Sequence, residues 1–109
     1  MIRIRVERSK ADRSILSFQV EGHARYAKPG EDIVCAGVSA VTVGTVNAVE
    51  KLTGIVPESR MKNGFLSARI PQDTEEGKRS EVQLLLESMV VMLLSIEESY
   101  GAYIQVQDQ

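Results

Sequence analysis

The sequence predicts a single α+β domain, in which an antiparallel or mixed sheet packs against two helices in the order ββαββαβ. Two observations lead to this prediction. Short runs of alternating apolar and polar residues have the period of half-buried strands, and two longer segments repeat apolar residues every three or four positions, as amphipathic helices do. With 109 residues, 43% of them hydrophobic, the chain can bury one modest core, so residues 1–109 are predicted to form one domain.

The first two strands are predicted at residues 2–7 and 16–21. In each run an apolar side chain recurs at every second position, beginning with Ile2 and Ile4. The intervening residues 8–13 are polar or small, which leaves no large side chain to anchor them in a core. This stretch is therefore predicted to be a hairpin connection.

A polar loop is predicted at residues 22–31. Gly22, Pro29 and Gly30 disfavour a continued strand, because glycine is flexible and the proline ring fixes its backbone. The two glycines are also candidate hinges, so that the loop could act as a lid.

A helix is predicted between an N-cap at Asp32 and a stop at Gly54. The segment is rich in valine and contains two further glycines, which keeps a strand as the alternative, but it is too long for one strand. The stripe expected to face the core consists of Val34, Val38, Val41, Thr45, Ala48 and Leu52.

A second hairpin is predicted from Asn63-Gly64, a two-residue turn signal that separates strands at 55–61 and 65–70. Pro57 has no amide donor, so the first of these strands should lie at an edge or begin irregularly.

The second helix should follow a polar linker at 71–79, with Ser80 as a possible cap and Gly101 as its stop. A last strand is predicted at 103–107. The core stripe of this helix should comprise Val82, Leu85, Leu86, Met89, Leu93, Ile96 and Tyr100.

Composition excludes several classes of protein. A net charge of -2 and a pI near 5.4 give no general reason to bind nucleic acid. The amino terminus lacks the apolar region of a signal peptide, and the longest apolar run, 89–94, is too short to cross a bilayer, so a cytoplasmic protein without a membrane partner is expected. One cysteine and one histidine are too few for a disulfide or a structural zinc site, and no metal or cofactor is predicted.

The single cysteine, Cys35, and the single histidine, His23, form a candidate catalytic pair. Behind an Asp32 cap, Cys35 would be the third helical residue, where free amides and the helix dipole favour a thiolate. His23 would end the preceding strand and could accept and return a proton during acyl transfer. Amides near the cysteine could form an oxyanion hole.

Structural roles compete with these catalytic ones. The thiol could be inert core filling. Asp32 could serve only as a cap and not orient the catalytic pair, and Ser39, one turn beyond Cys35, could bond back to its helix and take no part in the reaction. A thiol-based acyl hydrolase of small molecules is a third possibility, which would require a closed pocket in place of a groove.

The motif around these residues resembles the signature of the ribosomal-processing cysteine protease family, Prp, also known as YsxB-like proteins. The residues that carry the resemblance are Gly22-His23-Ala24, Gly30, the run 32–36 and Val38-Ser39. The length and the ββαββαβ order also agree, so the resemblance covers essentially the whole chain.

The resemblance implies an endopeptidase that removes a short N-terminal extension from the large-subunit ribosomal protein numbered twenty-seven during ribosome assembly. It implies Cys35 as nucleophile and His23 as general base and acid. Asp32 and Ser39 match further motif positions of open role, and the loop between Gly22 and Gly30 is implied to move when peptide binds.

The same resemblance implies a homodimer and an extended peptide held in a groove, cut after apolar or aromatic residues. The alternative from another class is a noncatalytic ribosome-assembly factor, which would bind a ribosomal protein or its precursor through the same groove.

Overall fold

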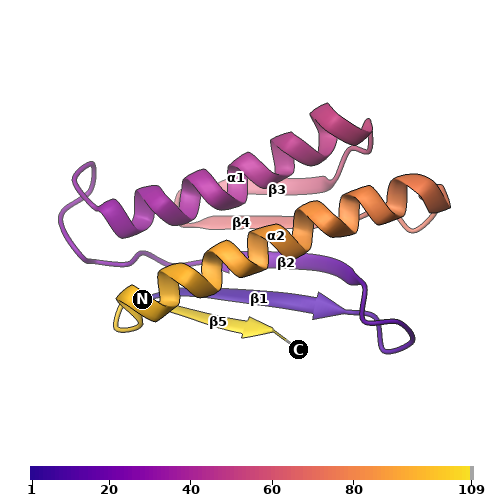
Figure 1. Cartoon of the computed structure of the whole chain (residues 1–109). Coiled ribbons are helices and arrows are strands. Elements are labelled where there is room, and N and C mark those ends of the chain that lie inside the picture. Colours follow the sequence, from indigo (N-terminus) through magenta and orange to yellow (C-terminus); the bar gives the residue numbers. More distant parts are fainter. Residues whose placement is uncertain (109) are drawn as a thin grey trace.

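The computed structural model describes residues 1–108, and its elements follow the predicted order (Figure 1). The α+β class and the number of helices and strands are thus confirmed. The elements are β1 (Ile2–Arg8), β2 (Ile15–Glu21), α1 (Ile33–Thr53), β3 (Glu58–Lys62), β4 (Phe65–Arg69), α2 (Glu76–Tyr100) and β5 (Ile104–Asp108).

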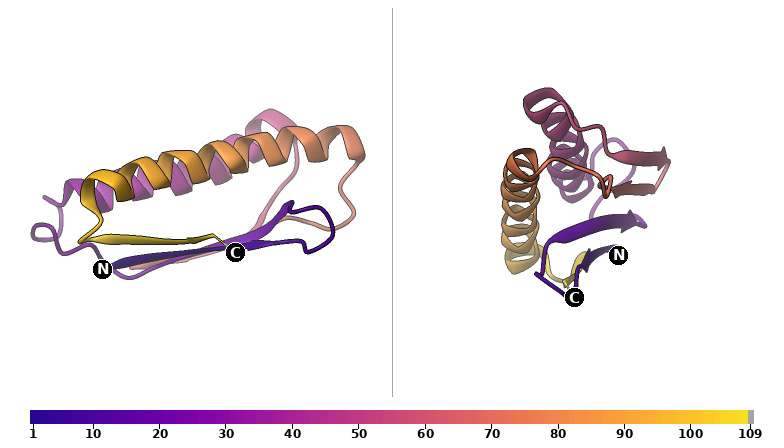
Figure 2. Two further views of the ribbon diagram at one scale, coloured as in Figure 1. Left: turned by 60° about the horizontal axis from the view of Figure 1, so that its bottom comes forward. Right: turned by 90° about the vertical axis from the view of Figure 1, so that its right-hand side faces the viewer.

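The five strands form one mixed sheet in the spatial order β3-β4-β2-β1-β5. All neighbours are antiparallel except β1 and β5, which run parallel. Both helices lie on the same face of the sheet, so the molecule has two layers (Figure 2). The first strand of the second hairpin, β3, is at the edge, as the proline at position 57 predicts. Alternation along β1 buries Ile2, Ile4 and Val6 beneath the helices.

The helix α1 begins and ends as predicted, but its buried stripe is rotated in the second half. Asp32 caps it, and Gly54 ends it in the left-handed conformation with φ of 78°. The buried residues are Val34, Val38, Thr42, Thr45, Val49 and Thr53, whereas Leu52 is 68% exposed.

Threonine explains the error in the predicted stripe. The hydroxyls of Thr42, Thr45 and Thr53 each donate to the carbonyl four residues earlier. Because the helix itself satisfies these polar groups, threonine can occupy the buried face and a leucine can be left outside.

By length and composition, α1 is also apolar enough to cross a membrane. Its mean hydropathy is 1.5, and 28% of the 18-residue window that gives this value is buried. The prediction from uninterrupted apolar runs overlooked this helix, because serine, threonine and glycine interrupt it. Core helices of globular proteins pass the same test, and α1 runs alongside α2 above the sheet (Figure 1).

The helix α2 begins earlier than predicted, and Ser80 is not its cap. The helix starts at Glu76, preceded by Glu75, which makes no side-chain capping bond. Its first turn is polar and exposed, so the apolar period that marks the rest of the helix is absent there.

Arg8, the last residue of β1, joins this end of the sheet to α2 and β5. Its guanidinium donates to both oxygens of Glu87 on α2, at 2.6 and 2.8 Å, and to both oxygens of Asp108 on β5, at 2.6 and 3.1 Å. The Arg8 side chain is only 9% exposed. The hydrogen bonds to Glu87 and Asp108 raise the pKa of Arg8, and they outweigh burial, which lowers it.

Candidate active site

Cys35 lies at the third residue of α1, as predicted, and is half-buried. Its Sγ accepts a hydrogen bond from the Ala24 amide at 3.3 Å. This contact joins the start of α1 to the loop that follows β2. The thiol receives its hydrogen bond from that loop amide and not from the imidazole of His23.

Asp32 uses both carboxylate oxygens on backbone amides. Oδ1 accepts from Val34 and Cys35, both at 3.0 Å, and so caps α1. Oδ2 accepts from Tyr26 and Ala27, at 2.9 and 3.2 Å, and so ties down the loop. Burial disfavours the charged carboxylate, but the four amides outweigh it and hold the pKa of Asp32 below its ordinary value.

The same bonds limit where an oxyanion hole can form. The amides of Val34 and Cys35 are occupied by the Asp32 side chain, and the amide of Ala36 donates to the Asp32 carbonyl. These three amides of the first helical turn are therefore not free to bind a developing oxyanion.

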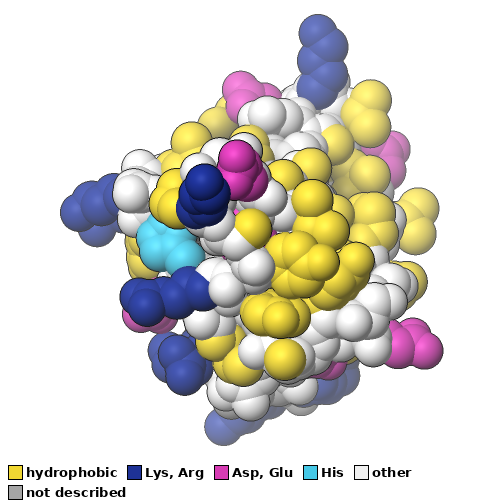
Figure 3. Space-filling model, turned by 90° about the vertical axis from the view of Figure 1, so that its left-hand side faces the viewer, with side chains coloured by type: hydrophobic (Ala, Val, Ile, Leu, Met, Phe, Trp, Pro, Cys, Tyr) yellow, Lys and Arg dark blue, Asp and Glu magenta, His cyan; other side chains and the backbone are white. Residues whose placement is uncertain are grey.

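His23 follows the end of β2 and is exposed. Gly22, just before it, has φ of 95°, and a side chain there would collide with the carbonyl oxygen of Met1. Gly22 is therefore packed against the β1 start, which is a structural reason for glycine besides the predicted hinge. At the surface, His23 lies among Lys and Arg side chains (Figure 3).

The loop between Gly22 and Gly30 is anchored at its middle. The Tyr26 ring packs edge-on against Tyr100 and Tyr103, with centroids 5.7 and 5.1 Å apart. Together with the bonds to Asp32, these contacts hold one side of the loop to the end of α2. Gly30, in contrast, has open space around it and φ of 86°.

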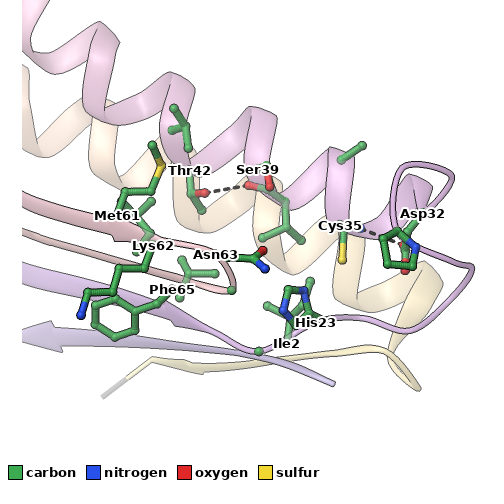
Figure 4. Close-up of a pocket in the computed structure, with 18 of the residues that line it drawn as sticks. Ile2, His23, Asp32, Cys35, Ser39, Thr42, Met61, Lys62, Asn63 and Phe65 are labelled. Carbon is green, nitrogen blue, oxygen red and sulfur yellow. Dashed lines mark hydrogen bonds between the residues drawn. The ribbon is translucent and has the colours of Figure 1, made fainter.

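Cys35, His23, Asp32 and Ser39 line one cavity of about 720 Å³ between α1 and the sheet. The Cys35 sulfur and the His23 ring point into the same space beneath α1 (Figure 4). Ser39 is exposed one turn farther along the helix. Gly22 and Gly30 line the cavity as well, so all six predicted site residues come together.

The hairpin of β3 and β4 supplies a wall that sequence reasoning missed. Its residues 61–66 line the cavity opposite α1, and Met61, Lys62 and Asn63 are exposed there. Exposed lining residues leave the cavity open to solvent. An open cavity suits an extended chain better than a small enclosed substrate, which weakens the prediction of a small-molecule hydrolase.

Comparison with known proteins identifies the family. The family model described as cysteine protease Prp matches residues 1–105. This chain belongs to that family. A ribosomal processing cysteine protease Prp from Bacillus subtilis is 41% identical over 108 residues, which are 97% of this chain and 96% of the relative. One from Staphylococcus aureus is 38% identical over 89 residues, 80% of each chain.

Solved structures of the S. aureus Prp protease agree. One with a covalently linked product peptide has a TM-score of 0.88 and 33% identity, and one with a substrate peptide has a TM-score of 0.82 and 32% identity. Each comparison covers 98% of both chains. The resemblance drawn from the motif is thus confirmed, and the chain is a cysteine protease. The noncatalytic alternative is set aside.

Proposed function

We propose that this Prp family member cuts a peptide bond in a ribosomal protein, with Cys35 as nucleophile and His23 as general base and acid. The observation that carries the proposal is that the only cysteine and the only histidine of the chain line the same solvent-accessible cavity. A cysteine protease needs a thiol, and this chain offers no other.

In the proposed reaction, His23 takes the proton of the Cys35 thiol, and the thiolate attacks the carbonyl carbon of the scissile bond. The tetrahedral intermediate collapses as His23 returns the proton to the leaving amine. Water, deprotonated by His23, then attacks the thioester, releases the acid product and restores the thiol.

The proposed substrate is the N-terminal extension of the large-subunit ribosomal protein numbered twenty-seven. Two observations support a peptide substrate: the relatives are named ribosomal processing proteases, and one solved relative holds a substrate peptide. The cavity extends along α1 from Cys35 to Val43, and Met61 and Phe65 also line it. Such apolar walls would favour apolar or aromatic residues beside the cut.

The test is cleavage of the extended ribosomal protein, followed by mass spectrometry. Wild type should release the extension, while Cys35→Ala and Cys35→Ser should each lose more than about 10³-fold in rate. Alanine has no nucleophile, and the serine alcohol beside one histidine is hard to deprotonate. His23→Ala should also be slow. Equal cleavage by wild type and Cys35→Ala would refute the assignment.

We also propose a cytoplasmic homodimer that binds neither membranes nor nucleic acid directly. The acidic composition supports the last point. The solvent face of α2 supports self-association, because Leu84 is 72% and Val91 63% exposed, two turns apart on one side of the helix. Met92 and Leu94 extend this apolar surface.

A further inference from the structure

The turn between β3 and β4 lies against the side chain of His23. Asn63 and Gly64 form the turn, and both line the cavity with His23. Asn63 lies beside the His23 ring, on the side toward α1 (Figure 4). The backbone fixes this arrangement, because the Gly22 amide donates to the Gly64 carbonyl at 2.9 Å. The turn and the residue before His23 are thus directly joined.

The imidazole fills the space that a side chain on Gly64 would need. A Cβ atom at this position would lie 2.6 Å from Nε2, 3.1 Å from Cε1 and 3.3 Å from Cδ2 of His23. Real Cβ contacts essentially never fall below 3.0 Å. Any side chain at position 64 would therefore push the ring out of its observed place.

The backbone of the turn does not by itself require glycine. Gly64 has φ of +75°, in the left-handed region that asparagine also adopts in turns. Asparagine would satisfy the turn but would still carry a Cβ. The absence of that atom is needed for the His23 ring.

We propose that Gly64 is a positioning residue: because it has no Cβ, the His23 imidazole can pack against its Cα and is held in the cavity that Cys35 also lines. The inference rests on the proposed role of His23 as base. Because His23 is exposed, a displaced ring can turn into solvent, and the loss should appear in catalysis more than in folding.

Gly54 provides a matched control. Its φ of +78° is nearly the same, and a Cβ there would meet only the end of Lys78, at an ordinary 3.5 Å. Substitutions Gly54→Ala and Gly54→Asn therefore impose the same backbone strain, far along α1 from Cys35, without touching His23.

The first experiment measures kcat/KM on the extended ribosomal protein. Gly64→Ala and Gly64→Asn should each lose roughly 10²-fold while remaining folded by circular dichroism, and the Gly54 variants should retain activity. In a His23→Ala background, Gly64→Ala should cause no further loss. A further loss of similar size in that background, or full activity in both Gly64 variants, would overturn the proposal.

The second experiment does not depend on cleavage. His23 is the only histidine, so its ring gives one set of NMR signals. Wild type should show a nuclear Overhauser effect between the His23 ring and the Gly64 Hα protons, and Gly64→Ala should shift the ring signals while Gly54→Ala should not. Absence of this nuclear Overhauser effect would refute the packing of His23 against Gly64. A wild-type protein that shows the effect but does not cleave the substrate would refute only the proposed function.

Discussion

At the scale of single residues, Asp32 connects the two segments that carry the candidate catalytic pair. One oxygen holds the start of α1, where Cys35 lies, and the other holds the loop between Gly22 and Gly30, which contains His23. Its role is therefore larger than that of a helix cap, and it acts on the site through backbone positions.

Replacing Asp32 with serine separates its two tasks. Serine is a good N-cap, so α1 should keep its start, but the hydroxyl is too short to reach the amides of Tyr26 and Ala27 as well. The expected result is faster hydrogen exchange at those two amides and lower kcat/KM, with helix content unchanged. Asp32→Ala, which loses both tasks, is the reference, and unchanged exchange at Tyr26 would contradict the tether.

Sequence could predict much of the site at this scale, because Asp32 and Cys35 are three positions apart and their capping relation is local. His23 could be paired with Cys35 because strand end and helix start are close in the chain. The contact between Gly64 and the His23 ring could not be predicted. The pair Asn63-Gly64 predicts a turn, but it does not reveal which side chain packs against that turn.

At the scale of elements, the guanidinium of Arg8 joins one helix to two neighbouring strands. Its bonds to Glu87 and Asp108 span 79 and 100 positions of sequence. The strand pattern identified β1 as half-buried, but no periodicity reveals partners so far away. The late start of the predicted second helix has a different, local cause: its first turn is polar and exposed and therefore has no apolar pattern.

Removing the Arg8 guanidinium, and with it the bonds to Glu87 and Asp108, should destabilise the fold in a pH-dependent way. The hydrogen bonds from Arg8, opposed by burial, lower the pKa of Glu87. The stabilisation is therefore present above the ordinary carboxyl range and lost as pH falls through the lower folded value.

Arg8→Met should cost about 1–2 kcal/mol at pH 7, a value reduced for the partial exposure of Glu87, and less at pH 3. Urea unfolding at the two pH values measures it. Arg3→Met, on the exposed side of the same strand, should change stability by less than about 0.5 kcal/mol. Equal losses at both pH values would rule out an ionic contribution.

At the scale of the whole molecule, two helices on one face leave an apolar strip of α2 toward solvent. If this strip forms the proposed dimer contact, Leu84→Glu with Val91→Glu should shift the protein to monomer, since facing charges would be buried without partners. Sedimentation velocity measures the change. Gln105→Glu, exposed on β5, should leave the dimer intact, and a wild-type monomer would refute the proposal.

The layered architecture follows from the order of elements, because two hairpins and two amphipathic helices have few ways to bury their apolar faces. The position of the cavity does not follow from the order of elements. It depends on β4 pairing with β2, which brings residues 61–66 under α1, and that pairing joins segments distant in sequence.

The cavity under α1 sets a limit on how stable this protein can become. A larger apolar side chain at Val43 would cover part of the half-buried apolar wall of the cavity and raise the free energy of unfolding. It would also occupy the space that the proposed peptide needs. Activity and stability therefore make opposite demands on this position, and the proposed peptide would cover apolar surface that the fold alone leaves exposed.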